Sequence, residues 1–335
     1  MSTENTKYHS AGNCLIETAS KSLILGNNAS VIPTDGSVTS ITSNAFRDCT
    51  SLTSIEIPNS VTSIGNYSFQ NCTGLTSIEI PNSVTSIGNR AFYGCTGLTS
   101  IEIPDSVTSL GYEVFKNCSN LTNAKLGGGI TALITDCFND CSNLKNLSIP
   151  DSLNMIDKFV GGITTGTDDA LLFNKLTNLT YNVYNNCSYL GNDINPYVLL
   201  VKCNDKSISS VTIHPNTKII GNRAFYNCDS LIEIVIPDNV KMLGYSCFSS
   251  CDKLTTVTIS ASLETIMCRA FSSCKALTSV TFNDVDTWYV KSGTTVDLLD
   301  VSVNATYLTS TYKNNNWRKD SQTGCGSVSI YSPFV

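Results

Sequence analysis

Apolar and polar positions repeat along the chain with a period of 23 residues. The segment SLTSIEIPNSVTSIGNYSFQNCT begins at Ser51 and recurs with few changes from Gly74 and again from Gly97. Two columns of residues keep this phase: Phe46, Phe69, Phe92, Phe115, Phe138, Phe225, Phe248 and Phe271, and Cys49, Cys72, Cys95, Cys118, Cys141, Cys228, Cys251 and Cys274. A fixed period of this length predicts a solenoid in which each repeat forms one coil.

Each coil is expected to contain a short strand followed by a turn. Leu52, Ile55 and Ile57 follow an L-x-x-L-x-L pattern, which places Ile55 and Ile57 inward and Glu56 outward by strand alternation. Pro58 then ends the strand. About six apolar groups per coil are too few to offset the entropy of ordering one coil alone, so the coils must stack and the ends must be capped.

The repeat spacing changes in the middle of the chain. Leu144, Leu176 and Ile208 are 32 residues apart, and Leu231 follows at the normal 23. This spacing predicts two enlarged coils at about 144–207. The segment NNCSYLGNDINPYVLLVK contains two apolar runs around a turn, which predicts a hairpin projecting from the stack.

The expected domains are an N-terminal cap at 1–37, the solenoid at 38–282 and a C-terminal cap at 283–335. Apolar runs at 14–16 and 23–25 predict a capping hairpin at the start. The C-terminal cap is marked by aromatic residues, namely Trp288, Tyr289, Tyr307, Tyr312 and Trp317.

The repeat LTSIEIPNSVTSIGNxAFxxCTGL resembles the BspA-type leucine-rich repeats of bacterial and protist surface proteins, over about residues 14–282. The resemblance implies a curved, right-handed, β-rich leucine-rich-repeat superhelix. It also implies a non-enzymatic role in adhesion at the cell surface or after secretion. One departure is that Ser60, Ser83 and Ser106 occupy the position where ordinary leucine-rich repeats have Asn or Cys. The ladder of asparagines is therefore expected to be absent.

One outward column changes from acidic to neutral along the solenoid: Glu56, Glu79, Glu102, Lys125 and Ser148, then Val235, Thr258 and Thr281. Neighbouring carboxylates in stacked coils repel each other, and a basic partner would relieve this repulsion. The alternative is that duplicated coils have inherited a solvated glutamate that binds nothing. The candidate binding residues are Glu56, Glu79, Glu102 and Lys125, with Tyr189 and Tyr197 on the expected hairpin.

The expected partner is a protein, such as a host matrix or plasma protein or the surface of another cell, bound by a monomer. The rival hypothesis is a structural spacer that presents other domains. A net charge of −6 with 21 scattered basic residues argues against nucleic acid. No apolar run approaches the roughly 20 residues that span a bilayer, and the polar start MSTENTKYHSAGNC does not resemble a signal peptide.

The chemistry-bearing residues do not form a recognisable catalytic or metal motif. Of the 15 cysteines, eight occupy one position of successive coils, where their Cβ vectors would be parallel and unsuited to disulfides. Buried, reduced cysteines are therefore expected, with a disulfide framework as the alternative. His9 and His214 are the only histidines, and neither lies beside an acid or nucleophile motif. The sequence predicts no enzyme, no metal and no cofactor.

Overall fold

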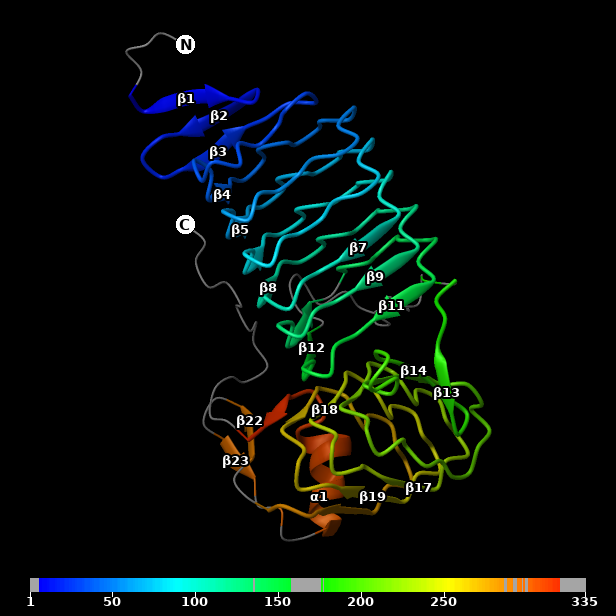
Figure 1. The fold of residues 1–335 in the computed structure, drawn as a ribbon. Helices are drawn as coiled ribbons and strands as arrows, with labels where there is room; N and C mark the ends of the chain where they lie inside the picture. The colour runs from blue at the N-terminus through cyan, green and yellow to red at the C-terminus, as the bar shows by residue number, and fades with distance from the viewer. Residues whose placement is uncertain are drawn as a thin grey trace. The chain divides into compact units, whose positions relative to one another are not determined.

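The computed structural model describes residues 6–134, 136–157, 176, 178–285, 288–291, 294–296, 298 and 301–319. The chain forms two compact units, and the repeat spacing did not predict this division. Unit 1 comprises residues 1–153 and 172–180, and unit 2 comprises residues 154–171 and 181–335. Each unit contains coils of a β-solenoid (Figure 1).

The strands are short, as expected for narrow coils. In unit 1 they are β1 (Tyr8–Ala11), β2 (Cys14–Glu17), β3 (Ser22–Leu25), β4 (Ser40–Ile41), β5 (Ser63–Ile64), β6 (Ser86–Ile87), β7 (Ser100–Glu102), β8 (Ser109–Leu110), β9 (Asn123–Lys125), β10 (Ala132–Ile134) and β11 (Asn146–Ser148). In unit 2 they are β12 (Met155–Asp157), β13 (Asn182–Tyr184), β14 (Cys187–Leu190), β15 (Leu199–Cys203), β16 (Ile219–Ile220), β17 (Glu233–Val235), β18 (Met242–Leu243), β19 (Thr256–Ile259), β20 (Thr265–Ile266), β21 (Ser279–Phe282), β22 (Trp288–Lys291), β23 (Thr294–Val296) and β24 (Trp317–Arg318).

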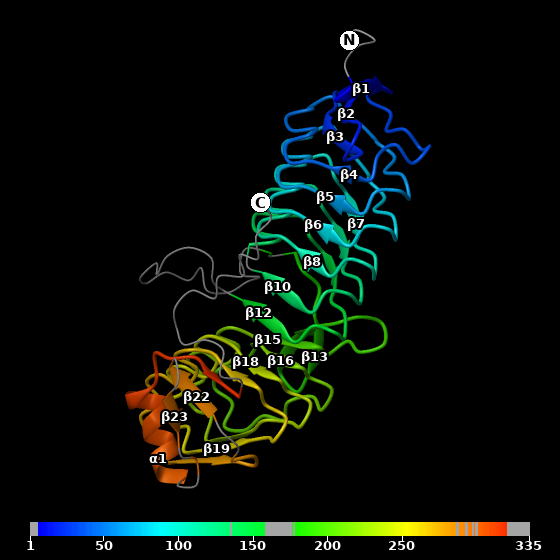
Figure 2. The same ribbon diagram turned by 90° about the vertical axis from the view of Figure 1, so that its left-hand side faces the viewer.

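Unit 1 begins with an antiparallel meander and continues as parallel coils. β1 pairs with β2 and β2 with β3 in antiparallel fashion, which includes the hairpin expected at 14–25. From β3 onward the order β3-β4-β5-β6-β8 is parallel, and Figure 2 shows these strands side by side. On another side of the coils, β7, β9 and β11 form a second parallel sheet.

The phenylalanine column forms the core of the stack. Consecutive rings in unit 1 are stacked with centroids 5.1 to 5.6 Å apart, and those in unit 2 with centroids 5.0 and 5.2 Å apart. Phe92 and Phe248 are completely buried, as are most members of the column. A buried aromatic ring removes a large apolar area from water. The 23-residue repeat therefore supplies one ring of this stack per coil.

A tight bend surrounds each phenylalanine of the column. The residues two before and two after the ring have positive φ, as at Asn44 and Asp48 around Phe46 and at Arg90 and Gly94 around the ring two coils later. The amides of alternate bend residues donate to carbonyls of the next coil, for example Phe46 N to Ser68 O at 2.7 Å. These bonds between coils compensate for a conformation that costs non-glycine residues roughly 1–2 kcal/mol each.

Side-chain hydroxyls and thiols also connect the coils. The serines at the expected asparagine position donate to a carbonyl of the preceding coil, as Ser83 Oγ does to Val61 O at 2.6 Å. Ser60 and Ser106 make the same bond at 2.6 and 2.8 Å. The cysteine column does likewise, with Cys95 Sγ 3.1 Å from the carbonyl oxygen of Phe69. A serine ladder and a thiol ladder thus take the structural place of the asparagine ladder.

The prediction of a projecting hairpin in the second enlarged coil is wrong. β13, β14 and β15 form an antiparallel meander, and β15 continues in parallel register to β16. β14 is buried along its whole length, and β15 is buried except at Lys202. Two apolar strands of this length bury more surface in the core than in a projection. The first predicted enlarged coil includes residues 158–175, which lie outside the described residues.

The meander of unit 2 repeats the one that begins unit 1. In each meander the first two strands are joined by a two-residue turn, after which the second strand begins at a cysteine. Both turn residues have positive φ: Gly12 and Asn13 in unit 1, and Asn185 and Asn186 in unit 2. Each meander then passes into parallel coils. The end of unit 2 is covered differently, because β24 pairs antiparallel with β20 and the rings of Trp288 and Trp317 pack beside Phe282. Helix α1 (Val301–Thr306) and the π-helical turn η2 (Tyr307–Thr311) lie in the same region.

Candidate functional site

Three members of the expected binding column of unit 1, Glu102, Lys125 and Ser148, lie on the sheet formed by β7, β9 and β11 (Figure 1). The register places Glu102 beside Lys125 and Lys125 beside Ser148. Lys125 Nζ donates to Glu102 Oε1 at 2.6 Å, although both side chains are largely exposed. An exposed ion pair contributes at most about 1 kcal/mol to stability. Its larger effect here is to neutralise one end of the acidic column.

Glu56 and Glu79 occupy the same column in the two preceding coils. Both are exposed, whereas the isoleucines on either side of them are buried, as the alternation predicts. Within the described part of the chain, neither carboxylate is engaged in an ion pair or hydrogen bond. Coils stack about 4.8 Å apart, and two charges at roughly that spacing repel by about 1 kcal/mol even in water. Unit 1 therefore presents two uncompensated carboxylates beside an internal ion pair.

The corresponding sheet of unit 2, formed by β17, β19 and β21, carries no charge in this column. Val235, Thr258 and Thr281 lie in register across the three strands. Val235 is 62% exposed, and nearby Ile232 is 48% exposed. Unit 2 therefore offers apolar contacts where unit 1 offers charge.

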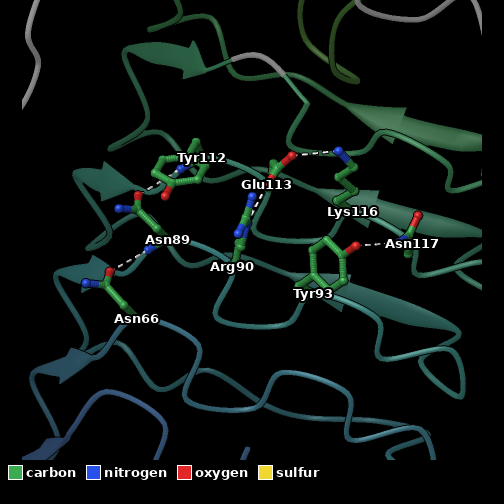
Figure 3. A network of polar contacts seen from close by, with 8 residues as sticks. All are labelled: Asn66, Asn89, Arg90, Tyr93, Tyr112, Glu113, Lys116 and Asn117. Atoms are coloured by element: carbon green, nitrogen blue, oxygen red, sulfur yellow. Dashed lines mark hydrogen bonds and ion pairs between the residues drawn. The ribbon is translucent and has the colours of Figure 1, made fainter. Parts of the chain in front are cut away.

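A second polar site lies at the bends of unit 1, around Arg90 (Figure 3). Arg90 Nε donates to one oxygen of Glu113, and Lys116 Nζ donates to the other at 2.6 Å. The guanidinium carbon lies 5.5 to 5.8 Å from the centroids of three tyrosine rings, those of Tyr67, Tyr93 and Tyr112. Cation–π contacts of this kind contribute about 0.5–2 kcal/mol each. The cluster therefore joins three consecutive coils.

Glu113 is the centre of this cluster. It is only 9% exposed, and burial alone would raise the pKa of its carboxyl; the hydrogen bonds from Lys116 and Arg90 outweigh burial and lower the pKa below its usual value. A ladder of amides continues the network, with Asn66 Oδ1 accepting from Asn89 N at 2.8 Å (Figure 3). Asn117 Nδ2 donates to the Tyr93 hydroxyl at 2.9 Å.

The sequence analysis missed this cluster. Its signal was the column two residues before each phenylalanine, which reads Asn44, Tyr67, Arg90, Glu113 and Asp136 in unit 1. An arginine followed by a glutamate one period later predicts an ion pair between stacked coils. These residues lie at bends, outside the strand positions from which the binding column was predicted.

Tyr189 and Tyr197 lie within the meander of unit 2 and pack against each other, with ring centroids 5.4 Å apart. Tyr189 is fully buried, so its ring offers no surface to a partner. Tyr197 is partly buried and stacks on the ring of His214 at 3.8 Å. Burial lowers the pKa of His214. At the tip of the loop, Ile194 is 95% exposed.

The cysteines of the described ranges are buried free thiols. Burial raises the pKa of Cys72 to about 12, so such thiols stay protonated at neutral pH. Within those ranges, His, Cys, Asp and Glu side chains do not gather in threes with an arrangement suited to a metal ion. The helices seen there are also too short or too polar to cross a membrane.

Comparison with known families identifies the class of protein. The family described as BspA type leucine-rich repeat region matches in six copies, over residues 25–96, 62–191 and 202–303. The chain belongs to this family. The family's repeat architecture is generally non-enzymatic and suggests a role in protein binding at a surface.

Several solved structures are similar to the chain. A leucine-rich repeat protein from Bacteroides ovatus is 22% identical, with 84% of this chain and 88% of that chain covered and a TM-score of 0.31. The pneumococcal vaccine antigen PcpA is 17% identical, with coverage of 84% and 83% and a TM-score of 0.41. A leucine-rich cell surface protein from Faecalibacterium prausnitzii is 18% identical, with coverage of 84% and 96% and a TM-score of 0.26. No curated protein matches the chain.

Proposed function

We propose that the chain is a non-enzymatic, adhesive protein-binding module of the cell surface, and that the sheet face of unit 1 docks a basic protein. The observation that carries this proposal is the pair of exposed carboxylates at Glu56 and Glu79, which have no internal partner in the described chain. Lys125 already neutralises Glu102, so the remaining negative charge is concentrated on the first two coils of the column.

The physical basis is electrostatic complementarity. A basic partner would replace repulsion between stacked carboxylates by attraction, and complementary charge also accelerates association. The surrounding surface is rich in exposed Ser and Thr, so it offers hydrogen-bonding groups to a partner. Family membership supports a binding role, and surface location rests on the same relationship.

The proposal is tested by surface plasmon resonance of the purified chain against a panel of extracellular matrix and plasma proteins. A variant with Glu56→Lys and Glu79→Lys is measured beside it. We expect saturable binding that this variant loses by at least tenfold, and that weakens as salt is raised from 50 to about 300 mM.

A charge-matched control separates this face from the net charge of the protein. Asp229→Lys with Asp238→Lys changes the charge equally but alters exposed positions of unit 2. This control should bind like the native chain. Equal loss of binding in both variants would show that only the net charge of the protein matters. If the native chain binds no protein of the panel, the result would favour the structural spacer.

A further inference from the structure

Two cysteines face each other across the meander that begins unit 2. Cys187 on β14 lies directly opposite Cys203 on β15 in an antiparallel pair. Residues opposed in this way have Cα atoms about 4.5–5.5 Å apart, within the range of about 4.4–6.8 Å seen in disulfides. Their side chains share one face of the sheet and are 0% and 6% exposed.

This arrangement differs from that of the cysteine column. Column cysteines belong to parallel coils, and six of the eight donate through their thiols to a phenylalanine carbonyl of the preceding coil, as Cys251 does to Phe225 O at 3.2 Å. Parallel Cβ vectors disfavour a bond between stacked members. The opposed pair lies on antiparallel strands, where the two Cβ atoms are brought together.

Only one of the two meanders contains this pair of opposed cysteines. Cys14 in unit 1 corresponds to Cys187, since both follow the asparagine of the turn. The position of Cys203 corresponds to Gly26, because Gly26 N donates to Ala45 O at 2.8 Å and Cys203 N donates to Ala224 O at 2.7 Å. A Cβ at Gly26 would lie 1.9 Å from the ring of Phe46. Only the meander of unit 2 therefore places a second thiol at this position.

We propose that Cys187 and Cys203 form a reversible disulfide that staples the meander of unit 2 under oxidising conditions. The oxidant is a small-molecule disulfide of the glutathione class. The Cys203 thiolate attacks one sulfur of the oxidant, forms a mixed disulfide and releases one thiolate. The Cys187 thiolate then attacks the Cys203 sulfur and releases the second. Two protein thiols are oxidised, one disulfide is reduced to two thiols, and the two protons pass to the released thiolates.

Cys203 is suited to the first step by its position. It ends β15 and is followed by the exposed residues 204–207, so a small opening of this edge gives access to its sulfur. In the folded protein the Cys203 thiol donates to the carbonyl oxygen of Asp205 at 3.1 Å, at this same exposed edge. Cys187 is completely buried, and is therefore suited to the resolving step.

The bond can be detected in the full chain by mass spectrometry. The protein is equilibrated in glutathione buffers of stepped redox potential, blocked with N-ethylmaleimide and digested with trypsin. Cleavage after Lys202 separates the two cysteines, because Cys203 falls in the peptide 203–206 and Cys187 in the peptide 176–202. We expect a linked pair of these peptides in oxidised samples, and a thermal midpoint higher by about 5–10 °C than in reduced samples.

Variants make the assignment specific. Cys203→Ser and Cys187→Ala should each abolish the linked pair and the dependence of the midpoint on oxidant, whereas Cys228→Ser should retain both. A link between 203–206 and the peptide 224–241, which contains Cys228, would overturn the proposed pairing. Complete alkylation of native Cys187 and Cys203 after denaturation of the oxidised sample would overturn the disulfide itself. The peptide map of the native chain tests the disulfide even if a variant fails to fold.

Discussion

The two units are built to one plan but differ in their outward chemistry. Each begins with an antiparallel meander, continues in parallel coils and stacks phenylalanines along its core. In unit 1 the sheet column is charged, and the bends carry the Arg90–Glu113–Lys116 cluster. In unit 2 the sheet column is Val235 and threonines, and the bend column that holds Glu113 in unit 1 reads Arg223, Ser246 and Arg269.

The comparison shows that inward and outward columns vary independently in this fold. An inward position must fill the space between two neighbouring coils, so the same residue type recurs in both units. An outward position contacts only solvent and its two neighbours in the column, and so can change without altering the stack. Function should therefore be sought in columns whose chemistry differs between the units.

The largest expected effect is common to both units. Phe92→Ala in unit 1 and Phe248→Ala in unit 2 each remove a completely buried ring between two stacked rings. We expect each to lower the free energy of unfolding by about 3–5 kcal/mol, because a cavity adds to the lost transfer energy. Urea titration followed by circular dichroism measures this change. A loss below about 1 kcal/mol in one unit alone would break the equivalence of the two stacks.

Alanine should be tolerated less well in the meander of unit 1 than at the equivalent position of unit 2. Gly26→Ala places a methyl group against the Phe46 ring, so we expect a loss of about 1–3 kcal/mol. Cys203→Ala at the equivalent position only removes a sulfur and should cost about 1 kcal/mol under reducing conditions. Thermal unfolding of both variants tests this order. Equal stability of native and Gly26→Ala proteins would contradict the claim that the Phe46 ring excludes a side chain at this position.

The bend cluster should make unit 1 sensitive to acid. Because the pKa of Glu113 is lowered in the folded protein, its contribution is present above the unfolded pKa near 4.5 and is lost as pH falls through the folded value. Glu113→Gln should therefore cost about 1–2 kcal/mol at pH 7 and progressively less in acid. Ser246→Ala, an uncharged position of the same bend column in unit 2, provides the control.

The readout for this pair is urea unfolding at several pH values between 3 and 7. The difference between native and Glu113→Gln proteins should shrink towards acid, while that for Ser246→Ala should stay constant. A pH-independent loss for Glu113→Gln would assign the residue a packing role without electrostatic linkage.

The smallest effect is expected in the serine ladder. Ser83→Ala removes one hydrogen bond to Val61 O from a half-buried hydroxyl, and such a bond contributes about 1 kcal/mol. Ser37→Ala serves as a control at the first position of the same column, where the buried hydroxyl makes no bond to a carbonyl of a preceding coil in the described part of the chain. Thermal melts should show a shift for the first variant and a smaller one for the second.

The sequence predicted the solenoid, the coil length and the inward residues because these follow from the repeat. It placed the column of Glu56, Glu79, Glu102 and Lys125 on one outward face for the same reason. It did not predict the Lys125–Glu102 ion pair, because a pattern gives the column but not the side-chain conformations. The meander at Cys187 and Cys203 was misread as a projection, since apolar alternation does not distinguish a buried strand pair from an exposed one.

The most direct test of the binding face is hydrogen–deuterium exchange of the chain with and without the tightest partner from the matrix and plasma panel, with a deca-lysine peptide as a defined basic probe. We predict slower exchange on binding in residues 53–57, 76–80 and 99–102, with unit 2 unchanged. Protection confined to residues 232–235 or to the loop around Ile194 would contradict the assignment of binding to the acidic face of unit 1.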